Sequence, residues 1–386
     1  MENNRSRYKF LWNILLFIAF LYLFFVSIEL IGKAFKGFGG GFAEGLIATT
    51  SNPIVGLFIG VLATTIAQSS SLTTSVLVGM VAAGTITVPN AIPVIMGANI
   101  GTTVTNTIVA MAHITRKQEF KKAFSGAIVH DFFNLLTVAT LLPLHLLTQL
   151  IFGRGFLEIM ATGLARVFTG VGGAKFSSPL KMVTKPVIKL LYERLFPALV
   201  RPFFVQQTDD VKRAVAIVTL IFAILLLFLA LKYMTKFMRS AIATKMENLF
   251  DGYLFKTAIR SFVIGAIFTT IVQSSSVTTS LAVPLVAAGI LTIEQIFPYV
   301  LGANLGTTIT AMLAALATGS EFAITVAFAH LCFNICGTAI WYPLKKLPIK
   351  MALKMAEICT ESRKLALAYL IVVFYIVPGL LILIMR

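Results

Sequence analysis

Residues 68–105 read QSSSLTTSVLVGMVAAGTITVPNAIPVIMGANIGTTVT, and residues 273–310 read QSSSVTTSLAVPLVAAGILTIEQIFPYVLGANLGTTIT. At a fixed offset of 205, 21 of these 38 positions are identical. Both copies hold a Gln-Ser-Ser-Ser run and, further on, a Gly-Ala-Asn-x-Gly-Thr-Thr run. A duplication of this length predicts that the chain is built from two structural repeats.

The sequence around both copies is apolar. Charged residues make up 12% of the chain, against roughly 25% in an ordinary soluble domain, and the mean hydropathy is +0.92. Residues 10–31 alone exceed the ~20 apolar residues that cross a bilayer, and without a cleavage site they indicate a retained helix rather than a signal peptide. Because helices satisfy their own backbone in lipid, we predict an all-α integral membrane protein.

Each repeat is expected to contain a re-entrant helical hairpin and a broken transmembrane helix. The hairpins are residues 53–84 and 257–289. Each apolar arm in these residues is shorter than a membrane span, which favours a re-entrant hairpin over two crossings. The broken helices are residues 90–112 and 295–318, interrupted at the Gly-Ala-Asn run. The whole chain 1–386 is then a single membrane transport domain, divided into repeat 1 (about 10–151), a connecting segment (about 152–210), repeat 2 (about 211–343) and a C-terminal loop and span (344–386).

Three crossings in each repeat force the second copy to be inverted. This parity puts the N-terminus and the basic segments 113–122, 232–256 and 345–364 on one face, which the positive-inside rule predicts to be cytoplasmic. One segment conflicts with the rule. Residues 153–212 fall on the outer face but carry nine basic and four acidic residues, and amphipathic interfacial helices, such as residues 180–195, are our hypothesis for this part.

The duplicated polar runs indicate an ion and substrate site. Unpaired polar groups in the hydrocarbon region cost several kcal/mol each, so these groups need partners. Helix N-termini favour anions, and free carbonyl and hydroxyl oxygens favour a hard cation such as Na⁺. No Asp, Glu, Lys or Arg occurs in residues 53–112, and Glu294 alone occurs in residues 261–320. An anionic substrate would therefore depend on bound sodium for compensating charge. The scarcity of acidic residues in these two stretches also disfavours proton coupling, which typically uses intramembrane acids.

These paired motifs resemble the type II sodium–phosphate cotransporter family. The resemblance implies a secondary active symporter that couples Na⁺ entry to uptake of inorganic phosphate, mainly HPO₄²⁻, by alternating access around a midplane site between the two hairpins. The phosphate-binding residues it implies are Gln68, Ser69, Ser70, Ser71, Gln273, Ser274, Ser275, Ser276, Asn99 and Asn304. The sodium ligands it implies are Gln68, Ser71, Thr102, Thr103, Gln273, Ser276, Thr307 and Thr308.

Two further His–Asn pairs lie one helical turn apart, and each pair shares a helix face. They are His130 with Asn134, and His330 with Asn334. The simpler interpretation is a polar contact that locks neighbouring helices together. The alternative is a role in supporting the site or in gating.

The resemblance sets several other expectations. Sodium is a co-transported ion, no organic cofactor is expected, and the partners are phosphate, sodium and membrane lipid. Residues 153–212 lack the Cys and Asn that a disulfide-bonded, glycosylated animal loop requires, which suggests a bacterial inner membrane. Electrogenic relatives carry Asp at what looks like the Gly84 position, so Gly84 implies two Na⁺ per phosphate without net charge.

Transport of another oxyanion or a dicarboxylate remains open, as does a non-transporting membrane regulator. A net charge of +17 is explained by membrane topology, so no nucleic-acid partner is expected. The serines lack a Gly-x-Ser-x-Gly elbow or a Ser-x-x-Lys pairing, so an enzyme is not expected. Cys332, Cys336 and Cys359 form no disulfide or zinc framework.

Overall fold

The computed structural model describes residues 2–170, 179–204, 209–249 and 255–385. Every regular element in these residues is a helix, and seven of the helical stretches are long and apolar enough to cross a membrane. These seven are residues 8–37, 88–111, 117–152, 209–241, 293–318, 321–341 and 364–385. The all-α, multi-pass membrane architecture predicted from the sequence is confirmed.

The first predicted hairpin is two short helices, α3 (Pro53–Ala67) and α4 (Ser70–Ala83). Asn52 caps α3 by accepting a hydrogen bond from the Ile54 N–H (3.0 Å), and proline favours the first helical turn. At 15 and 14 residues, each arm is about 22 Å long, which is less than the ~30 Å hydrocarbon core. Neither arm can cross the membrane alone.

The second hairpin repeats this design with α12 (Ala258–Val272) and α13 (Ser275–Ala287). The chain reverses between the arms at Gln68 (φ 49°) and at Gln273 (φ 59°), and these are the two non-glycine residues with positive φ in the described structure. A left-handed conformation costs a non-glycine residue of order 1–3 kcal/mol and is concentrated at functional sites. Both repeats therefore place the same strained glutamine at the hairpin tip.

The first arm of each hairpin packs against the helix that follows the hairpin. In repeat 1 these are α3 and α5 (Val88–Gly101), and in repeat 2 they are α12 and α14 (Ile293–Thr318). A Cβ on Gly97 would lie 1.8 Å from the Leu57 carbonyl oxygen, and one on Gly302 would lie 1.9 Å from that of Phe262. Both contacts are related by the offset of 205, so the two repeats share the same packing.

The expected break in the long helices is found in repeat 1 alone. There α5 ends at Gly101, a turn covers Thr102–Thr103, and α6 (Val104–Met111) follows. In repeat 2 the prediction of a broken helix over residues 302–308 is wrong, because α14 is continuous from Ile293 to Thr318. The glycines of this run serve close backbone approach to α12, and a helix accommodates glycine without losing its hydrogen bonds.

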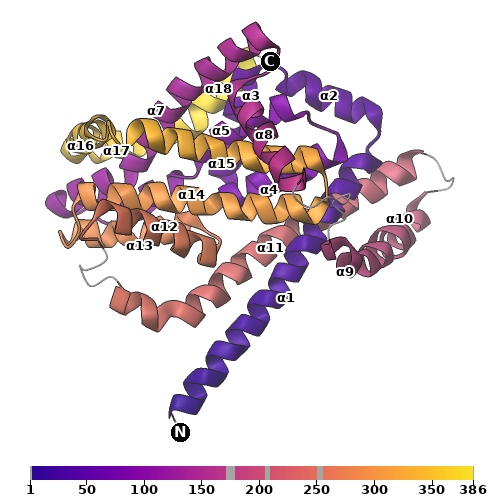
Figure 1. The fold of residues 1–386 in the computed structure, drawn as a ribbon, viewed down its shortest axis with the longest axis horizontal. Coiled ribbons are helices and arrows are strands. Elements are labelled where there is room, and N and C mark those ends of the chain that lie inside the picture. Colours follow the sequence, from indigo (N-terminus) through magenta and orange to yellow (C-terminus); the bar gives the residue numbers. More distant parts are fainter. Residues whose placement is uncertain (1, 171–178, 205–208, 250–254, 386) are drawn as a thin grey trace.

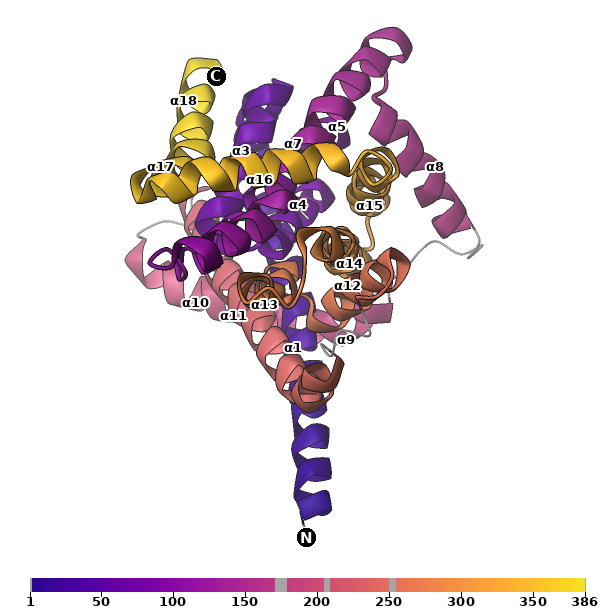
Figure 2. The same ribbon diagram turned by 90° about the vertical axis from the view of Figure 1, so that its left-hand side faces the viewer.

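The first long helix of each repeat packs against its counterpart in the other repeat. α1 (Glu2–Gly37) packs along α11 (Asp209–Leu249), and the rings of Phe20 and Tyr233 stack 4.9 Å apart. The N-terminal half of α1 projects from the helix bundle, and the C-terminus of the chain lies on the opposite side of the bundle (Figures 1 and 2).

The remaining helices surround this core. After α1 comes α2 (Gly40–Thr50), and the two repeats also contain α7 (Lys117–Phe152) and α15 (Glu321–Trp341). Residues 180–195, expected to be helical, form α9 and a π-helix. The connecting segment contains α8 (Phe156–Gly170), α9 (Pro179–Ile188), the π-helix η1 (Lys189–Leu195), α10 (Phe196–Val200) and η2 (Arg201–Phe203). The C-terminal part contains α16 (Lys346–Glu361), α17 (Arg363–Ile371), η3 (Val372–Ile376) and α18 (Val377–Met385).

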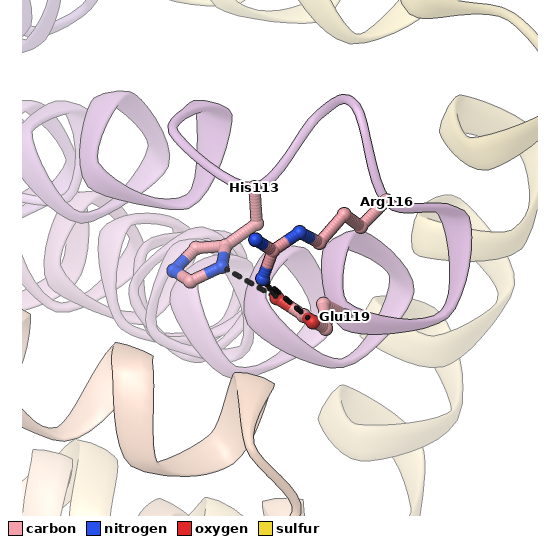
Figure 3. Close-up of polar contacts among 3 residues, drawn as sticks. All are labelled: His113, Arg116 and Glu119. Atoms are coloured by element: carbon pink, nitrogen blue, oxygen red, sulfur yellow. Dashed lines mark hydrogen bonds and ion pairs between the residues drawn. The ribbon is translucent and has the colours of Figure 1, made fainter.

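Polar contacts hold the turn between α6 and α7. Arg116 donates to both carboxylate oxygens of Glu119 (3.0 and 3.1 Å), and His113 Nδ1 lies 3.4 Å from Glu119 Oε2 (Figure 3). A further ion pair joins Lys121 to Glu357 on α16 (3.1 Å). Two of the basic segments that the charge rule assigns to one face of the membrane therefore lie side by side.

Candidate ion and substrate site

The first serine of each Gln-Ser-Ser-Ser run caps a helix. Ser69 Oγ accepts from the Leu72 N–H (3.2 Å), and Ser274 Oγ accepts from the Val277 N–H (3.3 Å). Each hydroxyl satisfies one of the four N–H groups that open a helix, and the N–H groups of the next two serines lack an intrahelical partner. The N-termini of α4 and α13 therefore offer free donors and partial positive charge, which suits an anion.

Buried hydroxyls without hydrogen bonds gather near the two tips. In the described structure the hydroxyls of Thr64, Thr65 and Thr269 have no partner, and neither does that of Ser75 on α4. Thr64 and Thr269 are related by the offset of 205 and are fully buried. A buried polar atom without a partner is rare and calls for an explanation such as an ion or a substrate.

The two tips differ in how their glutamines are held. Gln273 is 5% exposed, its Oε1 accepts from the Thr310 hydroxyl (2.9 Å), and its Nε2 donates to the Thr270 carbonyl. Gln68 is exposed, and Thr105, the counterpart of Thr310, is left without a partner. Gln273 therefore joins the second tip to its neighbouring helix, whereas Gln68 at the first tip is exposed.

Asparagine and histidine side chains join the two repeats at the centre of the molecule. Asn304 Nδ2 donates to Asn134 Oδ1 (3.1 Å) and to Asn334 Oδ1 (2.8 Å). His330 Nε2 lies 3.3 Å from Asn99 Oδ1. Asn134 also donates to the Asn99 carbonyl (2.8 Å), and Asn334 donates to that of Asn304 (3.4 Å). Of these contacts, those of Asn304 with Asn134 and of His330 with Asn99 cross between the repeats, and the others stay within one repeat. The helix-lock interpretation of the His–Asn pairs stays a prediction.

The second arm of each hairpin packs on a helix of the other repeat. α4 contacts α14, and α13 contacts α6 and α7. Thr279 on α13 donates to Asn106 Oδ1 on α6 (2.9 Å). Each second arm, which begins with a Ser-Ser pair, therefore lies against a helix of the other repeat.

A buried carboxylate stands beside this network. Asp131 on α7 is fully buried, and its Oδ2 accepts from the Tyr369 hydroxyl (2.9 Å). Its Oδ1 has no hydrogen-bond partner in the described structure. A carboxylate at this depth needs a proton or a cation as its counter-charge.

The four threonines expected to bind sodium all donate to carbonyls of their own helices. Thr102 donates to Ala98 O (2.9 Å) and Thr307 to the equivalent Ala303 O (3.1 Å). Thr103 donates to Ile100 O (2.9 Å) and Thr308 to Leu305 O (2.7 Å). Each hydroxyl keeps its oxygen lone pairs, so these groups remain able to act as cation ligands.

Most of the expected site residues therefore lie at the tips or in the network between the repeats. Asn99, Asn134, Asn304, Asn334 and His330 share hydrogen bonds, whereas both ring nitrogens of His130 lack a hydrogen bond in the described structure. Ser70, Ser71, Ser275 and Ser276 are buried and stand at the helix N-termini.

The residues predicted from the sequence did not include Asp131, although an acidic residue within an apolar span is a signal of a functional site. They also did not include Thr64 and Thr269. Extending the alignment of the repeats four residues upstream would have matched Thr64-Thr65-Ile66 with Thr269-Thr270-Ile271.

Comparison with known proteins identifies the family of this chain. The family model described as Na+/Pi-cotransporter matches residues 23–172 and 225–355, which are most of the two repeats. The chain belongs to the Na+/Pi-cotransporter family. This is a family of transporters rather than enzymes, and no solved structure matches the chain.

Two relatives in this family are similar over nearly the whole chain. The sodium-dependent phosphate transport protein 2B of Homo sapiens is 33% identical over 448 residues, covering 95% of this chain and 64% of the relative. The sodium-dependent phosphate transport protein 2A of Rattus norvegicus is 34% identical over 428 residues, covering 95% of this chain and 66% of the relative. The chain thus spans slightly less than two thirds of the length of either relative.

Gly84 does not lie at the hairpin tip. It ends α4 with φ 78° and borders a cavity of 550 Å³ that Arg154 and Glu158 also line. Glycine is the usual residue for such a left-handed helix end. This helix end gives Gly84 a local structural role. The stoichiometry of two sodium ions per phosphate, which the resemblance implies from Gly84, stays a prediction.

Proposed function

We propose that this member of the Na+/Pi-cotransporter family is a symporter that uses sodium entry to drive the uptake of inorganic phosphate. The single observation that carries the proposal is the pair of equivalent hairpin tips. Each holds a left-handed glutamine, an open helix N-terminus and at least one buried hydroxyl without a partner. The relatives named above are sodium-dependent phosphate transport proteins, which favours phosphate over another oxyanion or a dicarboxylate.

Phosphate and sodium would be bound by different groups of the site. The N–H groups at the N-termini of α4 and α13 suit phosphate oxygens, because the helix dipole favours an anion there. The threonine hydroxyls, the asparagine amide oxygens and the Asp131 carboxylate suit sodium, which prefers hard oxygen ligands. Because Lys and Arg are absent from residues 53–112 and 261–320, bound sodium would supply charge that phosphate needs, and this would couple the two ions.

Alternating access follows from the difference between the tips. In this scheme the Gln273 tip, which is fastened to Thr310, would form the closed side of the site, and the exposed Gln68 tip would form the accessible side. Exchanging these roles between two repeats of opposite orientation would carry the site from one face to the other. In this scheme the N-terminus is cytoplasmic and the protein lies in a bacterial inner membrane.

The first prediction is sodium-dependent flux in a purified system. Proteoliposomes with an inward sodium gradient should accumulate radiolabelled phosphate, and an equal potassium gradient should not drive accumulation. Unlabelled phosphate should compete fully, whereas sulfate and succinate at the same concentration should compete weakly. No sodium-dependent flux would indicate a non-transporting regulator, and full competition by succinate would indicate a dicarboxylate carrier.

The second prediction concerns Asp131. The isosteric Asp131→Asn removes the charge, and the sodium concentration for half-maximal uptake should rise about tenfold or more, since a contact to a charged group is worth about 1.5–3 kcal/mol. Asp210→Asn, at the exposed start of α11, is the matched control and should behave as wild type. Tyr369→Phe removes the donor to Asp131 and should give a smaller shift. An unchanged sodium dependence in Asp131→Asn would rule out the carboxylate as a sodium ligand.

A further inference from the structure

A cavity of 590 Å³ lies outside the transport site, between the end of α1, the η1–α10 segment and the start of α11. Four basic side chains line it: Lys36, Arg201, Lys212 and Arg213. Among the described residues that line it, Asp209 is the one acid, and it is paired with Lys212 (3.0 Å). The described structure shows no ion pair for the other three cations. The cavity therefore carries a net positive charge that suits an anionic group.

The wall of this cavity is anchored to the transmembrane helices. Thr184 on α9 donates to Glu29 on α1 (2.5 Å), and Lys33 lies over the ring of Tyr192 (5.7 Å). Phe196 packs edge-on against Phe222 of α11 (5.3 Å). α9 lies against α1, and α10 against α11, at the side of the bundle (Figures 1 and 2).

The outer side of the same segment exposes large apolar side chains. Met182 is 80% exposed and Phe203 is 83% exposed. Val183, Leu190, Leu195 and Leu199 are also exposed. A helical segment with one face on the protein, basic residues beside it and apolar groups facing outward is typical of a helix that lies in the membrane interface. Acyl chains would cover this apolar surface.

We propose that this cavity binds the headgroup of an anionic phospholipid, with the phosphodiester held by Lys36, Arg201 and Arg213 and the acyl chains against the outward apolar face. Basic pockets between transmembrane helices bind such headgroups. The proposal also accounts for the conflict in the charge pattern, because the basic residues of the connecting segment would contact anionic lipid rather than specify the side of the membrane. Inorganic phosphate has the same charge chemistry but would leave the apolar face without a function.

The test compares lipid binding by two triple variants. Purified protein in detergent is titrated with phosphatidylglycerol or phosphatidylcholine, and bound lipid is measured by native mass spectrometry. The cavity variant is Lys36→Gln/Arg201→Gln/Arg213→Gln. The matched control is Lys185→Gln/Lys189→Gln/Arg194→Gln, which removes the same charge from exposed positions of the same segment. Thermal melting of each variant checks that it is folded.

Wild type and the control should bind phosphatidylglycerol at least about tenfold more tightly than the cavity variant, because basic groups near an anionic headgroup attract it. Phosphatidylcholine should bind all three proteins equally weakly. Equal loss in both variants, or no preference of wild type for phosphatidylglycerol, would overturn the proposal. Displacement of phosphatidylglycerol by millimolar inorganic phosphate would assign the cavity to free phosphate instead. None of these readouts depends on transport.

Discussion

Sodium-dependent phosphate uptake is expected to fall to background when Gln273 is replaced by alanine. The Gln273 amide joins the hairpin tip to Thr310 on α14 and to the Thr270 carbonyl. Removing it leaves the Thr310 hydroxyl without this partner, at a cost of about 1–3 kcal/mol for a buried group, and frees the tip from its neighbouring helix. The initial rate of phosphate uptake in proteoliposomes is the measurement.

Three further variants separate the amide from other effects. Gln273→Gly suits the left-handed backbone (φ 59°) but lacks the amide, so it should lose uptake as well. Gln68→Ala should also lose uptake, because the second state of the cycle needs the first tip to close in the same way. Gln295→Ala removes an amide from the capping box of α14, and it should transport normally. Wild-type uptake by Gln273→Ala would remove this glutamine from the mechanism.

The second large effect is expected on folding. Gly97→Ala would place a Cβ 1.8 Å from the Leu57 carbonyl oxygen, and a backbone carbonyl cannot move aside as a flexible side chain can. Overpacking costs about 1–3 kcal/mol even in ordinary cores, and here α3 and α5 must separate. Little folded protein should be recovered, and its melting temperature in detergent should fall well below that of wild type.

Gly56→Ala is the matched control for this prediction. Gly56 lies on α3 at the same helix pair, but its nearest neighbour to an added Cβ is the Pro93 side chain at 3.5 Å, an ordinary contact. The same substitution should therefore leave the melting temperature near that of wild type. Gly302→Ala, the repeat 2 counterpart of Gly97→Ala, should be as damaging. Equal melting temperatures for Gly97→Ala and Gly56→Ala would show that the helices separate without cost.

Much of this architecture could be predicted because its causes are local in the chain. Apolar stretches of span length specify transmembrane helices through their own composition. The two hairpins follow from arms too short to cross and from polar tips that interrupt them. The duplicated runs placed Gln68, Gln273 and the buried serines at equivalent positions, and the structure places each glutamine at a chain reversal.

Other features depend on contacts between distant residues, and the tertiary structure alone decided these. The same glycine run suggested a helix break, yet α14 is continuous, because only the neighbouring α12 backbone shows that these glycines serve close packing. Asp131 meets Tyr369, 238 residues later in the chain, and His330 meets Asn99 across the repeats. Two nearly identical tips also differ, with Gln273 buried and Gln68 exposed. Local sequence is the same at both tips, so this difference arises from how the surrounding helices pack.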